Sequence, residues 1–233
     1  MRPAFGPQCV VCGDLLVSAQ LLMGDGRCHN CRDFPPEFAR AVSFGEYDGE
    51  LRGLIHLLKY EGITPAVPVL GKLLAQAISE LLPACGGHQP LLIPVPLHQS
   101  KQNQRGFNQA ELIARAAARR LWRKPEVASD VLIRHRETVS QVGLTREERI
   151  ANMQDAFRVA GRGRLRGRSV IVVDDVMTTG TTLSECARVL RKAGAEQVWA
   201  ATVARAFQAA GLRNTVDPRE EEASEAAAVA ASV

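Results

Sequence analysis

The segment 169–182 constrains the fold of this chain most strongly, because it joins an apolar strand, a polar turn and a helix start without a linker. Residues 169–173 read SVIVV, and helical periodicity resumes after the turn. A fully apolar strand followed at once by a helix is typical of a parallel sheet covered on both faces. Strand-like and helix-like segments alternate from 41 to 205. We therefore predict an α/β domain with a mainly parallel sheet flanked by helices.

The turn after this strand combines two acids with a Thr/Gly loop. It consists of Asp174, Asp175, Val176, Met177, Thr178, Thr179, Gly180, Thr181 and Thr182. Backbone amides, threonine hydroxyls and a helix N-terminal dipole together suit a phosphate dianion. The adjacent carboxylates suit vicinal sugar hydroxyls and can help to hold Mg²⁺. The alternative is a capped turn with two surface aspartates. We also expect Thr182 and Glu185 to form a capping box.

Residues 170–183 resemble the phosphoribosyl pyrophosphate (PRPP) signature of type I phosphoribosyltransferases, in which an acidic pair and a Thr/Gly loop follow an apolar strand. The resemblance implies that the loop binds the 5-phosphate of PRPP. It also implies that Asp174 and Asp175 are the catalytic pair that holds the ribose, with Mg²⁺ bound alongside PRPP. The segment is not a Walker A loop, because no Gly-Lys-Thr/Ser follows.

Three further segments narrow the resemblance. Residues 47–62, 93–114 and 136–157 precede the PRPP signature in the order found in the ComF family. This family comprises competence-associated, phosphoribosyltransferase-like proteins and includes relatives called GntX. The similarity covers nearly all of residues 9–205. It implies a type I phosphoribosyltransferase-like fold with a small N-terminal zinc ribbon and a role in DNA uptake.

Two loops are candidates for contact with the pyrophosphate of PRPP. In type I phosphoribosyltransferases a loop at the position of Val95, Pro96 and Leu97 contacts pyrophosphate, and Lys101 and Arg105 are the nearby cations. Arg105 also fits a plain surface charge. The stretch with Ser140, Gln141 and Arg149 resembles the mobile loop that closes over PRPP in amidophosphoribosyltransferases.

The N-terminal cysteines have the spacing of a metal site. Cys9 and Cys12 form one Cys-x2-Cys pair, and Cys28 and Cys31 form a second pair fifteen residues later. This is the four-ligand spacing of a structural zinc ribbon. Disulfides are the competing interpretation, and a chain without a signal-like N-terminus makes them the weaker one. His29, between two of the cysteines, can substitute for a ligand or be exposed.

Composition and charge limit the kinds of ligand and the cellular location that we expect. The net charge is +4, but residues 98–168 hold 16 Lys and Arg against 7 Asp and Glu. Such a basic middle suits a polyanionic ligand, although a solvated surface is the plainer interpretation. No apolar run is long enough for membrane insertion or export, so we expect a cytoplasmic protein. Trp122 and Trp199 have apolar neighbours, and we expect both to pack in the core.

We predict a zinc ribbon over 1–34, a phosphoribosyltransferase-like domain over 35–207 and a disordered, acidic tail over 208–233. Two function classes stay open. One is a phosphoribosyltransferase acting on an unidentified acceptor. The other is a non-catalytic accessory protein that binds PRPP or single-stranded DNA, or contacts competence DNA-uptake proteins. With only 5% aromatic residues, the chain has few side chains for base stacking. The sequence does not indicate an oligomeric state.

Overall fold

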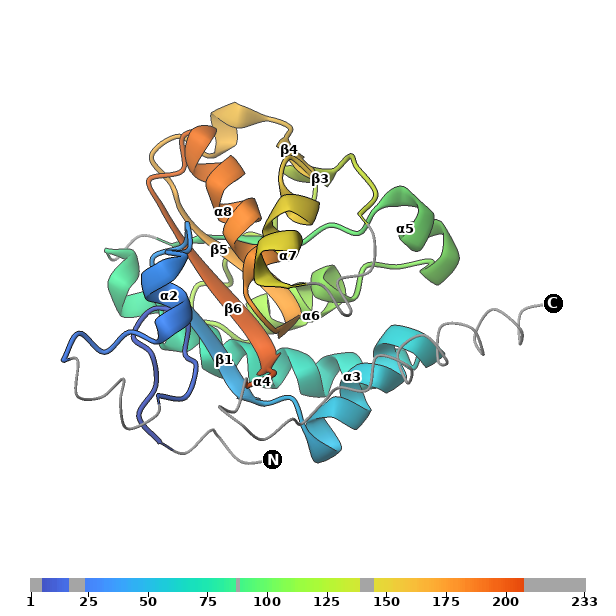
Figure 1. The fold of residues 1–233 in the computed structure, drawn as a ribbon. Helices are drawn as coiled ribbons and strands as arrows, with labels where there is room; N and C mark the ends of the chain where they lie inside the picture. The colour runs from blue at the N-terminus through green and yellow to red at the C-terminus, as the bar shows by residue number, and fades with distance from the viewer. Residues whose placement is uncertain (1–5, 17–23, 87–88, 139–144, 208–233) are drawn as a thin grey trace.

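A four-stranded parallel sheet forms the centre of the molecule in the computed structural model, which describes residues 6–16, 24–86, 89–138 and 145–207 (Figure 1). The strand order is β1-β6-β5-β2, and every neighbouring pair is parallel. The strands are β1 (Ala41–Glu46), β2 (Leu91–Pro94), β5 (Ser169–Met177) and β6 (Gln197–Arg205). This arrangement confirms the predicted α/β class.

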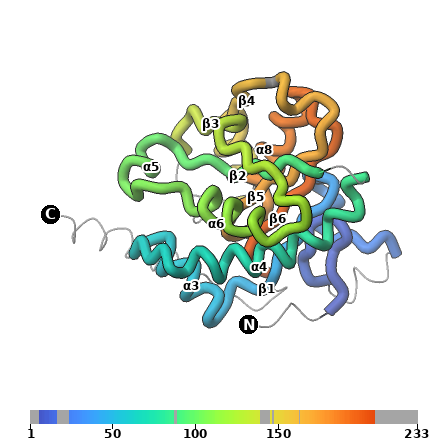
Figure 2. Tube along the Cα trace, turned by 180° about the vertical axis from the view of Figure 1, so that it is seen from behind, coloured from blue at the N-terminus to red at the C-terminus, as the bar shows by residue number. Residues whose placement is uncertain are grey.

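Helices cover both faces of this sheet. Against one face pack α3 (Gly49–Glu61), α4 (Val67–Ser79) and α6 (Gln109–Ala118), and Figure 2 shows α4 and α6 in front of the strands. The other face carries α8 (Thr181–Lys192), α7 (Arg146–Met153) and a hairpin of β3 (Leu132–Arg134) and β4 (Phe157–Val159). The short helices are α2 (His29–Asp33), α5 (Gln99–Arg105), η1 (Thr64–Ala66), η2 (Leu82–Cys85) and η3 (Arg162–Arg164).

The central strand β5 divides the hydrophobic core into two clusters. Val170 and Val172 belong to the cluster under α8, whereas Ile171 and Val173 belong to the cluster under α4 and α6. Successive side chains of a strand point to opposite faces, so Asp174 and Asp175 continue this alternation. β5 runs to Met177, beyond the predicted strand end, because β6 keeps pairing with it as far as Arg205. The acidic pair is therefore held within a strand and not in a turn.

The two tryptophans differ in their environment. Trp199 is buried in β6, as predicted. The prediction for Trp122 was wrong, because its side chain is 82% exposed. Helix α6 ends at Ala118, and the chain then passes through positive φ at Arg123 (64°) and Lys124 (46°). These left-handed residues turn the chain after α6, and Trp122 lies at the surface instead of continuing the helix.

Within the described residues, no helix combines the length and the apolar character that crossing a bilayer requires. The cytoplasmic location stays a prediction, as do the domain boundaries at 34 and 207. The predicted disordered tail, 208–233, lies outside the described residues.

Candidate active site

The Thr/Gly loop joins β5 to α8 through a left-handed glycine. Gly180 has φ of +78° and is the residue that precedes α8. A Cβ at this position would lie 3.0 Å from Cε of Met177 and 3.6 Å from Cζ of Phe38. Both the backbone conformation and the available space therefore require glycine. The loop also has an internal contact of 2.9 Å between the hydroxyl oxygens of Thr179 and Thr181.

The start of α8 differs from the predicted capping box. The helix begins at Thr181, after Gly180, and no side chain caps it. Glu185 instead accepts hydrogen bonds from the amide of Asp155 (2.8 Å) and from the guanidinium of Arg188. Because no side-chain cap covers the first turn of α8, its amide dipoles stay oriented toward the loop, where an anion is stabilised.

A pocket opens where the predicted PRPP loop lies. It has a volume of about 240 Å³, including the solvent at its mouth. Its wall consists of Asp174, Val176, Met177, Thr178, Thr179, Gly180, Thr181, Thr182 and Leu183. The structure therefore brings one carboxylate of the pair and the whole Thr/Gly loop to a common pocket at the carboxyl end of β5. Ligands of open α/β sheets bind at this edge.

The two aspartates differ in charge state. Burial raises the pKa of Asp174 well above its ordinary value, and the neighbouring Asp175 carboxylate raises it further. For Asp175 burial also acts to raise the pKa, but the charge of Lys59, two hydrogen bonds and the charge of Arg105 together outweigh it and lower the pKa below the ordinary value. Asp175 is only 3% exposed, so the alternative of two surface aspartates does not hold. The site therefore disfavours the ionised form of Asp174 and favours that of Asp175.

Lys59 is a site residue whose role the sequence did not reveal. Its Nζ lies 3.4 Å from Oδ2 of Asp175, which accepts no hydrogen bond within the described part of the chain. Burial disfavours the charged ammonium, but Asp175 together with Tyr60, Asp174 and Tyr47 more than compensates, and the pKa of Lys59 is raised. The available signal was its spacing: Lys59 follows the buried Ile55 by four residues, which places a cation beside the sheet-facing stripe of α3.

The predicted pyrophosphate loop lies beside the acidic pair. Val95 follows β2, and its amide donates to the carbonyl of Val173 at 2.8 Å. Val95 is buried and Pro96 and Leu97 are half-buried. The side-chain Nδ2 of Asn108 donates to the carbonyl of Val95 at 2.9 Å, while its side-chain oxygen caps α6. These contacts fix the loop next to the last residues of β5.

The two predicted cations of this region differ in position. Arg105 ends α5, where its guanidinium lies 5.9 Å from the ring centroid of Tyr60 and donates to Gln109 at 2.6 Å. Its charge also contributes to the lowered pKa of Asp175, after Lys59 and two hydrogen bonds. The structure therefore brings Arg105 to the acidic pair. Lys101, on the same helix, is exposed.

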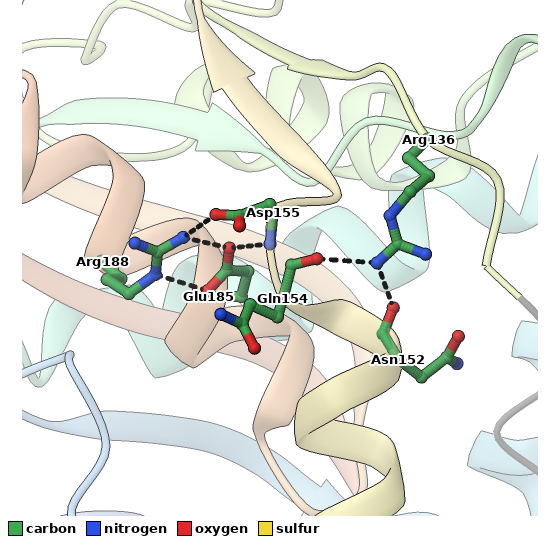
Figure 3. A network of polar contacts seen from close by, with 6 residues as sticks. All are labelled: Arg136, Asn152, Gln154, Asp155, Glu185 and Arg188. Atoms are coloured by element: carbon green, nitrogen blue, oxygen red, sulfur yellow. Dashed lines mark hydrogen bonds and ion pairs between the residues drawn. The ribbon is translucent and has the colours of Figure 1, made fainter.

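Only one predicted residue of the closing loop can be placed. Ser140 and Gln141 lie outside the described residues. Arg149 lies half-buried on α7, and this burial lowers its pKa. Arg136 donates to the carbonyls of Asn152 and Gln154 at 2.7 Å, so it caps the end of α7 (Figure 3).

The same network anchors α7 to α8. Arg188 on α8 pairs with Asp155 at 2.8 Å and with Glu185 at 2.6 Å (Figure 3). Glu185 also receives the amide of Asp155, which adopts a positive φ of 54° just beyond α7. The end of α7 is therefore tied to the helix whose start forms the phosphate loop.

The four N-terminal cysteines converge as predicted. Their sulfur atoms all lie within 4.8 Å of one another, and the pair Cys12–Cys28 is 3.6 Å apart. Zn–S bonds of about 2.3 Å in a tetrahedron place sulfurs about 3.8 Å apart, so the cluster fits a zinc ion. The amide of Cys28 donates to the sulfur of Cys9 at 3.3 Å. The residues can therefore hold a metal ion such as zinc. His29 is exposed and pairs with Asp33, outside the cluster.

Comparison with known proteins supports these observations. The family model described as "Phosphoribosyl transferase domain" matches residues 108–223, which include the Thr/Gly loop. The chain is 34% identical over 201 residues to "Competence protein F" of Haemophilus influenzae, with 83% of each chain covered. It is also 34% identical over 175 residues to "DNA utilization protein YhgH" of Escherichia coli strain K12, covering 74% and 75% of the two chains.

A shorter similarity links the chain to an enzyme of nucleotide metabolism. It is 50% identical over 56 residues to "Adenine phosphoribosyltransferase" of Mycolicibacterium gilvum, which covers 24% of this chain and 31% of that protein. The long matches extend over most of both proteins, and the sheet, the loop and the cysteine cluster agree with the expected architecture. The chain belongs to the ComF family and contains a phosphoribosyltransferase domain.

Proposed function

We propose that this protein binds PRPP together with Mg²⁺ at the carboxyl edge of its sheet and transfers the phosphoribosyl group to an acceptor during DNA uptake or natural competence. The observation that carries the proposal is the pocket in which Asp174 and the Thr178–Thr182 loop meet. The names of the relatives, a competence protein and a DNA utilization protein, support the biological setting.

The loop supplies the contacts that a 5-phosphate needs. In the proposed complex the phosphate lies against the first turn of α8, where backbone amides and the helix dipole stabilise negative charge. Thr178 is exposed at the loop surface, and Thr179 and Thr182 are half-buried. Their hydroxyls are placed to donate to phosphate oxygens. Gly180 allows the phosphate to approach the backbone closely.

The acidic pair holds the ribose and the metal in this proposal. Asp174 lines the pocket and accepts from ribose hydroxyls, and Asp175, its ionised neighbour, keeps the site negative. Carboxylate oxygens are ligands that Mg²⁺ prefers, and the buried Oδ2 of Asp175 makes only its ion pair with Lys59 among the described residues. When bound, Mg²⁺ would neutralise charge on pyrophosphate.

The proposed reaction is a displacement at ribose C1. The bond from C1 to the pyrophosphate oxygen breaks, its electron pair leaves with pyrophosphate, and the acceptor forms the new bond and loses its proton. The carbon carries positive charge between these events, so nearby carboxylates stabilise it. Arg105 and Lys101 are the cations that we assign to the departing pyrophosphate, where positioned charge lowers the barrier.

The direct test is binding of PRPP with and without Mg²⁺, followed by the thermal midpoint and by calorimetry. We expect PRPP with Mg²⁺ to raise the midpoint, and Asp175→Asn to weaken binding by roughly tenfold or more, the cost of a lost charged hydrogen-bond partner. Asp130→Asn, which removes an exposed carboxylate paired with Arg164 far from the loop, is the matched control. No shift for the wild-type protein would contradict the proposal. Pyrophosphate release with candidate acceptors then separates an enzyme from a PRPP-binding accessory protein.

A second candidate function, binding of single-stranded DNA, is favoured by the surface around Trp122. This side chain is 82% exposed and lies among the exposed Arg119, Arg120, Arg123 and Lys124. Cations track a phosphate backbone and an exposed indole stacks on a base, which contributes about 1–3 kcal/mol per base. Two consecutive residues of this surface have positive φ.

An oligonucleotide titration tests this candidate independently of PRPP, because α6 separates the two places. Its first residues are anchored near Val95, and the Trp122 surface follows its last turn. We expect anisotropy of a labelled single strand to fall steeply with salt. Trp122→Ala should weaken binding while leaving the PRPP midpoint shift intact. Equal oligonucleotide affinity of the variant and the wild type would remove this candidate.

A further inference from the structure

A buried arginine lies between the cysteine cluster and the phosphate loop. Arg205, the last residue of β6, is 4% exposed. One terminal nitrogen lies 3.5 Å from the sulfur of Cys12 and 3.5 Å from Oδ2 of Asp14. The other two guanidinium nitrogens have no hydrogen-bond partner within the described residues. A buried guanidinium with two orphan donors is costly, so its position needs an explanation.

The backbone at Arg205 pairs with the residue that precedes the Thr178–Thr182 loop. In the β5–β6 ladder Arg205 is the register partner of Met177, and the amide of Ala206 donates to the carbonyl of Met177 at 2.9 Å. The loop begins at the next residue, Thr178. A small pocket between the two sites is lined by Arg205, Asp14, Thr178 and Thr179, together with Cys12, Cys31, Asn30, Pro36 and Phe38. Its free space is about that of one water molecule.

The charges around Arg205 indicate what it does between the cysteine cluster and the loop. Four thiolates around a divalent metal carry a net negative charge, which would repel an anion in the neighbouring loop. Arg205 is the cation between them. Asp14 reaches only one of its guanidinium nitrogens, and Oδ1 of Asp14 has no partner among the described residues. Because Arg205 contacts the sulfur of Cys12, a metal ion that fixes this sulfur also fixes the guanidinium.

We propose that Arg205 is a positioning residue that couples metal occupancy of the four-cysteine site to the order and anion affinity of the Thr178–Thr182 loop. The metal-bound thiolates hold the guanidinium, and the guanidinium screens their charge from the loop and fixes its first residues. The anion-affinity part of this coupling rests on the proposed PRPP function. The metal retention and the order of the loop do not depend on it.

Zinc release from the full chain tests the metal side. The rate is followed with a chromogenic chelator for the wild type, Arg205→Met, Arg205→Lys and the control Arg168→Met, which removes a cation paired with Glu126 beside the first residue of β5. We expect Arg205→Met to release zinc about tenfold faster, within the usual range of coupling between sites. Arg205→Lys should recover part of the retention, and Arg168→Met should match the wild type. The proposal would be overturned if Arg205→Met released zinc at the wild-type rate, or if the Met and Lys variants released zinc at equal rates.

Hydrogen exchange of the amides at 178–182 tests the loop side without any ligand. Zinc removal should speed their exchange several-fold in the wild type but not in Arg205→Met, whose loop is already loosened. Amides of the β3–β4 hairpin serve as the internal reference. An equal response of both proteins to zinc removal contradicts the coupling.

A third measurement links the coupling to PRPP. Because coupling is reciprocal in binding free energy, PRPP with Mg²⁺ should raise the zinc affinity of the wild type, measured by competition with a chelator, and leave that of Arg205→Met unchanged. PRPP that binds without changing the zinc affinity of the wild type contradicts the coupling alone. Absence of PRPP binding contradicts the proposed function, and the zinc and exchange measurements then decide the role of Arg205.

Discussion

The two faces of β5 each carry one aspartate, at adjacent positions, and the pKa values of the two carboxyls are shifted in opposite directions. On the face of α3, Asp175 has Lys59 at 3.4 Å, and its pKa is lowered. On the face of α8, which carries Val172 and Cys186, burial raises the pKa of Asp174. Two adjacent aspartates can therefore have pKa values shifted in opposite directions. The largest contribution that lowers the pKa of Asp175 is Lys59, supplied by a helix more than a hundred residues earlier in the chain.

The largest effect on this comparison should come from Lys59→Met. Without the ammonium, two neighbouring carboxyls share a buried site that has lost its nearest compensating cation, and breaking a partly buried pair costs about 2–3 kcal/mol. Urea unfolding of the ligand-free protein measures this loss. The matched control is Lys72→Met on α4, where the side chain is exposed and the change should stay within about 0.5 kcal/mol. Equal stability of both variants would show that the two faces do not differ as described.

A change at Gly180 should cost about 1–2 kcal/mol and abolish the proposed PRPP binding. Gly180→Ala introduces a Cβ at a positive φ and within 3.0 Å of Met177 Cε, on the side of the strand that lacks the cation. The comparison variant is Gly53→Ala on α3, where a Cβ meets no atom within 4 Å. This second change should stabilise the helix by about 0.5–1 kcal/mol. Thermal unfolding and PRPP calorimetry measure both variants, and PRPP binding by Gly180→Ala at wild-type affinity would remove the loop from the site.

Asp174→Asn should stabilise the ligand-free protein by about 1 kcal/mol while weakening PRPP binding, because it removes a buried like-charge contact. Asp175→Asn should have the opposite sign on stability, since it leaves Lys59 without its partner. Denaturant midpoints at neutral pH rank the three proteins. If both variants were destabilised alike, the two carboxyls would be equivalent and the comparison between the faces would fail.

The smallest expected effect is the pH dependence of the Asp174→Asn difference. The pKa of Asp174 is raised in the folded state, so its contribution to stability is fully present below the unfolded pKa of about 3.9 and is lost as pH rises through the folded pKa. The stability advantage of Asp174→Asn over the wild type should therefore grow as pH increases from 4 and then level off. Asp175, with a lowered pKa, contributes above about pH 3.9 and loses that contribution as pH falls. Unfolding curves measured across this range would contradict the assignment if the advantage shrank with rising pH.

Local pattern was sufficient for much of this protein. The apolar run of 169–173, the Thr/Gly loop and the two Cys-x2-Cys pairs predicted the parallel sheet, the loop and the metal cluster from sequence alone. These features follow from short-range rules: strand alternation, the conformational freedom of glycine and the spacing of metal ligands. The residues involved lie close together in the chain or repeat at a short interval. The end of β5 was less predictable, because it depends on how far β6 continues to pair.

Only the tertiary structure decided the opposite pKa shifts of the acidic pair and the contacts of Arg205. Lys59 reaches Asp175 from α3, and Arg205 reaches Cys12 across 193 residues of sequence. Helical spacing puts Lys59 beside the sheet-facing stripe of α3, but no local pattern identifies the partner in either contact, since each depends on which faces of distant elements pack together. Burial then amplifies these few charges, because electrostatic interactions are stronger away from water. The sequence by itself determined which groups are available for chemistry, and the packing determined which of them are charged and which face one another.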